Sequence, residues 1–137
     1  IMQERFYREI IKLSKKAYKK NEVPVGAIIV KNNKIIAKAY NKIEKNHDAT
    51  MHAEILAIKK ASKKLKNWRL NECEMYVTLE PCKMCSSAIE LSRLKKIYYL
   101  VKKDKQILID KNKYIYKNNL YTKESLNLLR SFFKKVR

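Results

Sequence analysis

One histidine, one glutamate and two cysteines are spaced in this chain like the parts of a catalytic metal site. They occur in the segments His52-Ala53-Glu54 and Pro81-Cys82-Lys83-Met84-Cys85. Imidazole and thiolate groups bind Zn²⁺ well, and a hydrolytic zinc site keeps three protein ligands while water takes the fourth position. His52, Cys82 and Cys85 supply three ligands, so the sequence predicts a hydrolytic zinc site and not a closed structural one.

Glu54 is predicted to move protons and not to bind the metal. The pattern H-x-E followed by P-C-x-x-C is a signature already described for zinc-dependent nucleobase deaminases. Zinc lowers the pKa of a bound water to about 7, and the resulting hydroxide attacks an amidine carbon. Ammonia leaves only if a proton travels from the attacking water to the ring nitrogen and then to the amine. Glu54 is the candidate shuttle.

Other interpretations of the cysteines remain open at this point. A Cys-x-x-Cys pair in a cytosolic chain also occurs in redox motifs, in structural zinc sites and in ordinary helices. The order of the four groups, with Pro81 before the first cysteine, favours the catalytic interpretation. Cys73 has no partner motif and is expected to be a small core residue.

Two helix starts are expected to position these groups. If 51–65 is helical, Met51, Ile55, Ile58 and Leu65 share one apolar face, and His52 and Glu54 project differently from its first turn. Proline suits the first position of a helix, so a second helix is expected to begin at Pro81. Cys82 and Cys85 then lie one turn apart and can face the same metal, and the helix N-terminus favours their thiolates.

The rest of the chain alternates between helical and extended patterns. Residues Phe6, Ile10, Leu13 and Ala17 predict an N-terminal helix, and a last helix is expected from about Lys123. Strands are expected at Val25–Val30, Ile35–Tyr40, Met75–Leu79 and Ile97–Val101 and somewhere within Gln106–Tyr116, with a hairpin turn at Asn32-Asn33. The run Val-Gly-Ala-Ile-Ile-Val is typical of a strand covered on both faces. These patterns predict an α/β fold, a three-layer α/β/α sandwich in a single domain spanning residues 1–137.

The formal net charge of +20 favours a polyanionic partner, because contacts to phosphates supply much of the affinity of nucleic-acid-binding proteins. The excess is nearly all lysine, so genomic base composition is an alternative explanation. From residue 101 to 137 there are eleven basic and three acidic residues, interleaved with aromatic side chains that suit unstacked bases. Lys134 and Lys135 are therefore candidate RNA contacts. Leu126, Leu129, Phe133 and Val136 fall at helical spacing and are expected to face the core, whereas the pattern leaves the place of Phe132 open.

Export and membrane insertion are not expected. The segment Ile1–Ile11 is interrupted by charges and has no apolar run of signal-peptide or transmembrane length. The three cysteines do not suggest a disulfide framework, so a reducing cytoplasm is the expected compartment.

The chain resembles the bacterial tRNA-specific adenosine deaminases of the cytidine deaminase-like superfamily. The resemblance covers most of the chain and is specific, since few other families combine all its parts. Those parts are Glu22-Val23-Pro24-Val25-Gly26-Ala27, Asn41, His47-Asp48, His52-Ala53-Glu54, the run from Tyr76 to Cys85, Ser92-Arg93 and, more weakly, Ser131-Phe132-Phe133.

The resemblance implies a homodimer of the cytidine deaminase-like fold, with a central mixed sheet of about five strands and one Zn²⁺ per subunit. The implied reaction converts the wobble adenosine of a tRNA anticodon to inosine, with His52, Cys82 and Cys85 as ligands and Glu54 as the shuttle. In that family the position that matches Asn41 hydrogen-bonds the flipped base. An asparagine offers both a donor and an acceptor, and anticodon loops present bases that can be splayed out. For Asn41 alone, a turn residue that ends a strand is an equally open interpretation.

Two segments depart from the family pattern. Ala49 and Met51 occupy positions where the family has Pro and a small residue. After the strand at Ile97 the family commonly has an Arg-Asp pair and a Gly-rich loop that help to hold the anticodon, whereas this chain has Lys102-Lys103-Asp104 and no glycine. The contacts of that loop are not transferred to this chain.

Two other functions remain open. The first is deamination of a free base or nucleoside, of the guanine or cytosine type, although a small neutral substrate would need no polycationic surface. The second is a non-catalytic, zinc-containing RNA-binding subunit, although such a protein would have no use for Glu54.

Overall fold

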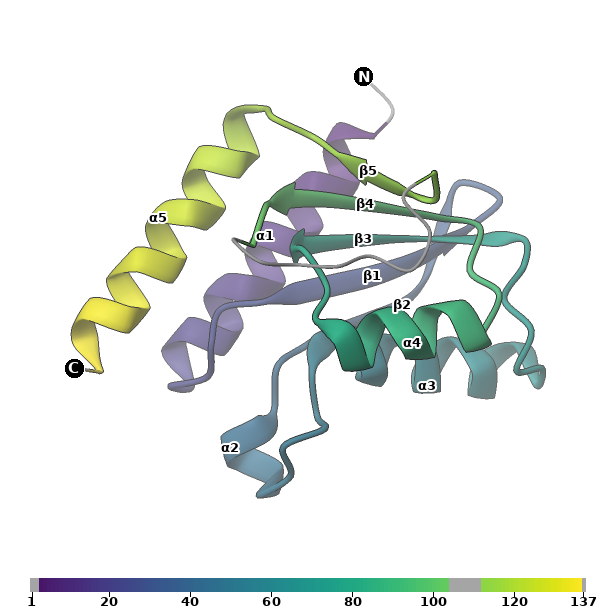
Figure 1. Ribbon diagram of the computed structural model, residues 1–137, viewed down its shortest axis with the longest axis horizontal. Coiled ribbons are helices and arrows are strands. Elements are labelled where there is room, and N and C mark those ends of the chain that lie inside the picture. The colour runs from purple at the N-terminus through teal and green to yellow at the C-terminus, as the bar shows by residue number, and fades with distance from the viewer. Residues whose placement is uncertain (1–2, 104–111, 137) are drawn as a thin grey trace.

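The computed structural model describes residues 3–103 and 112–136, and within them five strands form one mixed sheet in the order β2-β1-β3-β4-β5 (Figure 1). β1 pairs antiparallel with β2 and with β3, whereas β3 pairs parallel with β4 and β4 with β5. The strands are β1 (Gly26–Lys31), β2 (Lys34–Tyr40), β3 (Cys73–Leu79), β4 (Lys96–Val101) and β5 (Tyr114–Tyr116).

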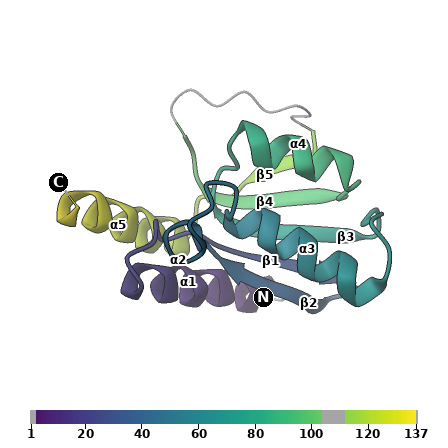
Figure 2. The ribbon, with the colours of Figure 1, turned by 90° about the horizontal axis from the view of Figure 1, so that it is seen from below.

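Helices cover both faces of this sheet (Figures 1 and 2). α3 packs against β1, β2 and α4 on one face, and α1 and α5 pack against the sheet and each other on the opposite face. The helices are α1 (Glu4–Lys19), the short α2 (Ile43–Asn46), α3 (Ala53–Leu65), α4 (Lys83–Leu91) and α5 (Leu120–Lys135). The predicted three-layer α/β/α sandwich with a central mixed sheet is confirmed.

The core divides into two apolar clusters because side chains alternate between the faces of a strand. Along β1, Ala27 and Ile29 join the cluster under α3 and α4, whereas Ile28 and Val30 join the cluster under α1 and α5. All four are buried. The continuous apolar run therefore corresponds to a strand covered on both faces, as predicted.

Two places in the β1–β2 hairpin restrict which residues can occur there. The hairpin turn is confirmed at Asn32 and Asn33, which both have positive φ values, of 49° and 64°, as a type I′ turn requires. At Gly26 the close approach of α1 leaves no room for a side chain. A Cβ there would lie 2.5 Å from the Ile10 carbonyl oxygen and 2.7 Å from the Leu13 Cβ.

Helix starts and the buried face of α3 differ from the sequence predictions. α4 begins at Lys83 with Cys82 as N-cap, so Pro81 precedes the helix and is not its first residue. α5 begins at Leu120 and not near Lys123, because Asn119 and Thr122 form a capping box. The residues of α3 that are fully buried are Ala53, Glu54, Ala57 and Ala61. Small alanines let α3 lie close to the sheet. Of the apolar face predicted from the sequence, Ile55, Ile58 and Leu65 are only half-buried, and Met51 is buried but precedes the helix.

The inward face of α5 was predicted correctly for Leu126 and Leu129 and incorrectly for Phe133 and Val136. Leu129 faces the core as expected, but Phe132 is the buried aromatic residue, 6% exposed, while Phe133 is 48% and Val136 55% exposed. Phe132 lies against Tyr18 of α1, with ring centroids 6.4 Å apart. Both phenylalanines fit a helical apolar stripe, and contact with α1 decides which of them is buried.

β5 lies inside the predicted range 106–116, and the part of that range before residue 112 is outside the described residues. Among the helices that the structure describes, none is long and apolar enough to cross a membrane.

Candidate functional site

The four predicted site residues meet where two helices begin on the same side of the sheet. His52 is the N-cap of α3 and Cys82 the N-cap of α4, with Glu54 and Cys85 in the first turns. α4 begins shortly after β3 ends. Each helix N-terminus carries a partial positive charge that stabilises nearby anions. Both helix N-termini therefore contribute partial positive charge beside the two thiols and the carboxyl group.

The three predicted ligands have the spacing that tetrahedral zinc requires. The Nδ1 atom of His52 lies 3.7 Å from Cys82 Sγ and 3.5 Å from Cys85 Sγ, and the three donor atoms lie within 4.8 Å of one another. Standard Zn–S and Zn–N bond lengths with tetrahedral angles place a nitrogen and a sulfur about 3.6 Å apart. The group can hold a metal ion, and Nδ1 is the imidazole nitrogen that would bind it.

The two thiols differ in their tendency to ionise. Hydrogen bonds from Cys85 and then from His52 lower the pKa of Cys82 to about 3. The hydrogen bond to Cys82 and burial raise the pKa of Cys85 well above its usual range. The hydrogen bond to Cys82 also raises the pKa of His52. A thiolate is thus already favoured at Cys82, and a cation bound between the sulfurs would favour the second one.

Glu54 is a buried carboxyl group with an unused oxygen. Its side chain is almost fully buried, and Oε1 has no hydrogen-bond partner among the residues that the structure describes. Burial raises the pKa of this carboxyl group, and the charges of His52 and Lys103 oppose that shift. An unpartnered buried carboxyl oxygen normally costs free energy of about 1–3 kcal/mol. Such a group is typical of a functional site when it lies beside a set of metal-ligand atoms. Here that set, named the donor cluster, consists of His52, Cys82 and Cys85.

Asn41 is buried beside the first turn of α3. Its Oδ1 accepts a hydrogen bond of 2.7 Å from the backbone N–H of Ala53, which fixes the orientation of the amide. Nδ2 has no hydrogen-bond partner within the described parts of the chain. Asn41 thus directly follows β2, as one interpretation expected, and its role in binding a base stays a prediction.

The segment between Asn41 and Ala53 is closed at its base and anchored at its tip. The N–H of Lys42 donates to the carbonyl of Met51 over 3.0 Å at the base. At the tip the Glu22 carboxylate, 2% exposed, accepts hydrogen bonds of 3.1 and 2.9 Å from the backbone N–H groups of Glu44 and Lys45. Glu22 therefore holds α2 and the loop that leads into His52.

Glu22, Glu80 and Lys103 were not among the predicted site residues. The buried Glu80 accepts a hydrogen bond of 3.0 Å from the Lys103 N–H, and the Glu80 N–H donates to Val101. The charge of Lys103 acts on His52, Glu54 and Cys85. Glu22 and Glu80 lie in the segments that carry the family resemblance, but the spacing of acidic residues does not show which of them is buried. The family's Gly-rich loop, which this chain lacks, would follow Lys103, and residues 104–111 at that place are outside the described residues.

The two predicted RNA contacts on α5 have different surroundings. Lys135 Nζ donates to Asn21 Oδ1 over 3.1 Å and lies 4.3 Å from the centroid of the Tyr18 ring. Lys134 has no such partner among the described residues and borders an open groove with Arg130 and Phe133. Lys135 thus ties α5 to α1, while the ammonium group of Lys134 remains available.

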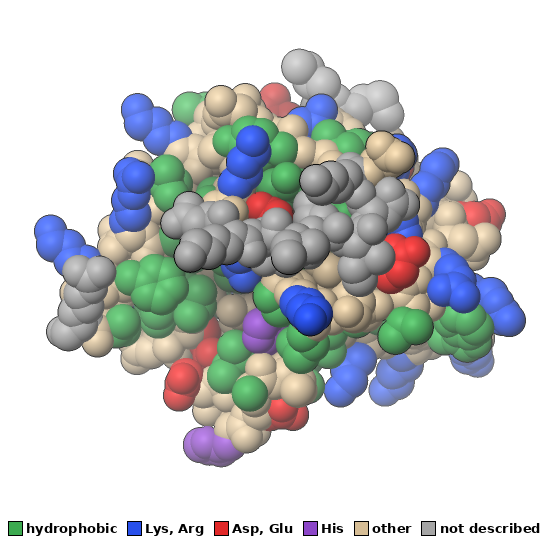
Figure 3. Space-filling model, viewed as in Figure 1, with side chains coloured by type: hydrophobic (Ala, Val, Ile, Leu, Met, Phe, Trp, Pro, Cys, Tyr) green, Lys and Arg blue, Asp and Glu red, His purple; other side chains and the backbone are tan. Residues whose placement is uncertain are grey.

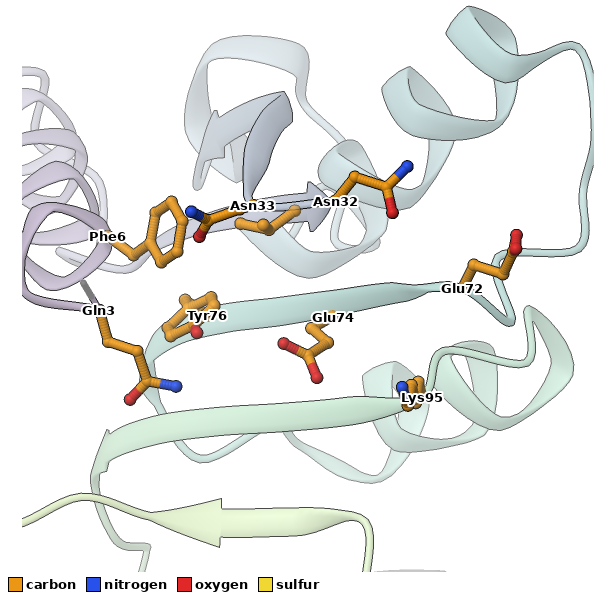
Figure 4. A pocket seen from close by; sticks show the side chains of 9 residues that line it. Gln3, Phe6, Asn32, Asn33, Glu72, Glu74, Tyr76 and Lys95 are labelled. Atoms are coloured by element: carbon orange, nitrogen blue, oxygen red, sulfur yellow. The ribbon is translucent and has the colours of Figure 1, made fainter.

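A separate pocket lies at the opposite end of the sheet from the metal ligands. It has a volume of about 360 Å³. Figure 4 shows Glu74 and Tyr76 on β3 between Gln3 of the N-terminal segment and Lys95 before β4. None of the four predicted site residues lines it. Its polar groups form a mixed lining without a metal-ligand set.

Comparisons with known proteins agree with this site. The family model of MafB19-like deaminases matches residues 1–137. The tRNA-specific adenosine deaminase of Aquifex aeolicus is 44% identical over 148 residues, which cover 98% of this chain and 96% of the relative.

Two solved structures share the fold. One comes from studies of A-to-I editing by tRNA:A34 deaminases at the wobble position. It is 35% identical with a TM-score of 0.73, over 75% of this chain and 79% of the other. The guanine deaminase of Bacillus subtilis is 28% identical with a TM-score of 0.69, over 96% of this chain and 93% of the other.

The sheet order, the donor cluster at two helix starts and the full-length matches thus agree with one another. The chain belongs to the MafB19-like deaminases and, among them, to the family of tRNA-specific adenosine deaminases.

Proposed function

We propose that this protein hydrolyses the wobble adenosine of a tRNA anticodon to inosine, using one Zn²⁺ per subunit held by His52, Cys82 and Cys85. The observation that carries the proposal is the unpartnered Oε1 of the buried Glu54 beside a donor cluster of the dimensions that zinc requires. A subunit that used the metal only for its structure would not need this carboxyl group.

The reaction adds water to C6 of adenine and removes ammonia. Zinc held by the three ligands would lower the pKa of a water molecule at its fourth position and so supply the nucleophile. The Glu54 carboxylate takes a proton from the attacking water and delivers it to N1 of the purine. It then transfers the second proton to the departing amine. Each transfer uses Oε1, which has no hydrogen-bond partner among the residues that the structure describes.

Asn41 would orient the base through its free donor. Its Oδ1 is occupied by the Ala53 N–H, so Nδ2 is the group that remains to bind a purine nitrogen. The same hydrogen bond ties Asn41 to the helix start that carries His52 and Glu54. The base and the proton shuttle would therefore be positioned by one element.

The proposal also includes the organisation and location of the enzyme. Residues 1–137 would form a single deaminase domain and act as a homodimer. Met84, Ala88 and Leu91 share the outward face of α4, and Leu91 is 69% exposed, which is a surface that a second copy can cover. The ligand thiols must stay reduced, and the free state of all three cysteines suits a cytoplasmic enzyme.

Substituting Glu54 tests the role of the carboxyl group. Glu54→Gln keeps the shape of the side chain but cannot shuttle protons, so deamination of tRNA should fall by at least about 100-fold while bound zinc stays at the parent level. Zinc is measured per chain by atomic emission, and inosine by nucleoside analysis. A variant that loses zinc together with activity would show that Glu54 supports the metal instead.

Free guanine is the second substrate to test, because the guanine deaminase of Bacillus subtilis shares the fold over nearly the whole chain. The charge of +20 favours the polyanionic substrate. Ammonia release from guanine, with tRNA left unmodified, would support the free-base reaction and contradict the proposal.

A further inference from the structure

The outer face of α3 carries a row of closely spaced lysines. Between Ile55 and Asn71 the chain has six basic residues and no acidic one. Lys59, Lys60, Lys63 and Lys64, here named the basic ridge, are all exposed, and no ion pair among the described residues involves them. Lys60 donates instead to the backbone carbonyl of Lys38.

Helix stability does not explain this arrangement. Lys59 and Lys63, and likewise Lys60 and Lys64, are like charges four residues apart, and each such pair destabilises a helix by about 0.2–0.5 kcal/mol. Only Lys63 and Lys64 lie in the last turn of α3, where the helix dipole favours cations. The helix dipole therefore does not account for Lys59 and Lys60, which form no ion pair with the described residues.

The basic ridge leads to an exposed tryptophan that contacts two arginines. Trp68 is 50% exposed. The guanidinium carbons of Arg69 and Arg93 lie 4.4 and 5.9 Å from the centroid of its ring. No ion pair in the described parts of the chain involves either arginine. This group, named the Trp68 stack, thus combines a flat apolar surface with two uncompensated charges.

The backbone holds the Trp68 stack in a fixed place. Arg93 follows α4 with a φ of 66°, a left-handed conformation that glycine usually adopts at a helix end. The Leu70 N–H donates to the Ser92 carbonyl over 2.7 Å and so links the two connections that carry the arginines. Arg93 Nη1 donates to the Glu90 carbonyl at the end of α4 over 3.2 Å, and the other guanidinium nitrogens have no hydrogen-bond partner among the described residues.

The row of charges begins near the donor cluster and ends far from it. His52 caps the first turn of α3 and the Trp68 stack follows its last turn, and thirteen helical residues span about 20 Å. Lys and Arg side chains gather over the lower right of Figure 3, where Figure 1 places α3 and the end of α4. A polyanion that enters the donor cluster could extend along this side.

We propose that the basic ridge and the Trp68 stack bind the tRNA substrate outside its anticodon loop. The lysines would contact successive phosphates, the arginines would bind a phosphate through their guanidinium groups, and the exposed indole would contact a sugar or an unpaired base. This inference rests on the proposed function, because it takes tRNA as the partner. It assigns a second contact region, which begins about 10 Å along α3 from His52 and ends about 20 Å from it.

The salt dependence of tRNA binding tests the basic ridge. The measurement uses the inactive Glu54→Ala protein, so that binding is followed without turnover. Adding K63Q and K64Q removes two ridge charges, and the matched control K12Q/K16Q removes two exposed charges of α1, on the opposite face of the sheet. The ridge variant should lower the slope of log affinity against log salt by about 1.5, and the control should lower it by less than half as much. Equal slopes for the two variants would overturn the proposal.

The only tryptophan of the chain reports on the Trp68 stack directly. Bound tRNA should change the emission of Trp68 and protect it from acrylamide, and W68A should weaken tRNA binding several-fold with zinc content unchanged. Binding without any change in emission or protection would overturn the proposal. The proposal would also be overturned if the emission of Trp68 changed with protein concentration in the absence of RNA, because this surface would then bind a second copy of the chain.

These readouts separate the inference from the proposed function. They measure binding in a protein that cannot turn over, so a failure of the parent enzyme to form inosine would not affect them. Conversely, inosine formation with no effect of K63Q, K64Q or W68A would leave the proposed function intact and overturn the second contact region.

Discussion

The two cysteines of the donor cluster and Cys73 occupy different positions in the fold. Cys82 and Cys85 face Nδ1 of His52 from the start of α4, whereas Cys73 is buried at the start of β3, as the sequence analysis expected. Burial raises the pKa of Cys73, so this thiol stays protonated and packs as a small apolar residue. Only the first two therefore have the positions of metal ligands.

Removing one ligand should abolish tight metal binding. Cys82→Ser should weaken zinc affinity by more than about 100-fold, since loss of an outer-shell partner alone costs 10–100-fold. Part of the folding stability should be lost with the metal. Chelator competition measures the affinity, and Cys73→Ala is the control that should retain zinc. Full zinc occupancy in Cys82→Ser would exclude this ligand set.

The two adjacent lysines of α5 should respond differently to substitution. Lys135→Ala removes the contacts with Asn21 and the Tyr18 ring, so it should lower the free energy of unfolding by about 0.5–1 kcal/mol. Lys134→Ala removes a cation without such contacts and should weaken tRNA binding while leaving stability nearly unchanged. Urea unfolding and a tRNA binding assay measure the two effects, and the reverse pattern would contradict the assignment.

At the scale of elements, the sequence predicted the features that depend on local residue patterns and missed those that depend on contacts between distant segments. The order of the strands along the chain, the Asn32-Asn33 turn and the presence of a helix after each ligand motif follow from residue type and local spacing, although α4 begins two residues later than predicted. The buried face of α5 does not, because Phe132 and Phe133 are equivalent until α1 places Tyr18 beside one of them. The burial of Glu22 and Glu80 likewise depends on partners more than twenty positions away.

Glu22 is expected to position the α2 segment for substrate binding. Glu22→Gln should weaken the two hydrogen bonds that hold α2 and should destabilise the protein by about 1.5–3 kcal/mol, as expected for bonds to a charged acceptor. Because α2 leads into His52, KM for tRNA should rise more than kcat falls, with zinc retained.

The matched control is Glu44→Gln, which changes an exposed carboxylate on α2 itself. It should leave both stability and KM near the parent values. If the two variants behaved alike in both assays, the anchoring role of Glu22 would be wrong.

At the scale of the whole molecule, the positive charge is spread over both helical layers, but the site and the basic ridge share one of them. α3 carries His52 and Glu54 at its start and, along its outer face, four lysines that form no ion pair with the described residues. The same layer therefore offers the chemistry and a route for a polyanion. A composition rich in lysine accounts for the total charge, but not for the absence of acidic residues between Ile55 and Asn71.

The measurement that tests the central claim most directly is inosine formation in a tRNA transcript with adenosine at the wobble position. The zinc-loaded protein and its Glu54→Gln variant are compared, and a transcript with guanosine at that position serves as the substrate control. We predict inosine at the wobble position with the parent protein alone, and no modification of the control transcript. A zinc-loaded parent protein that leaves the wobble adenosine unchanged would contradict the proposed function.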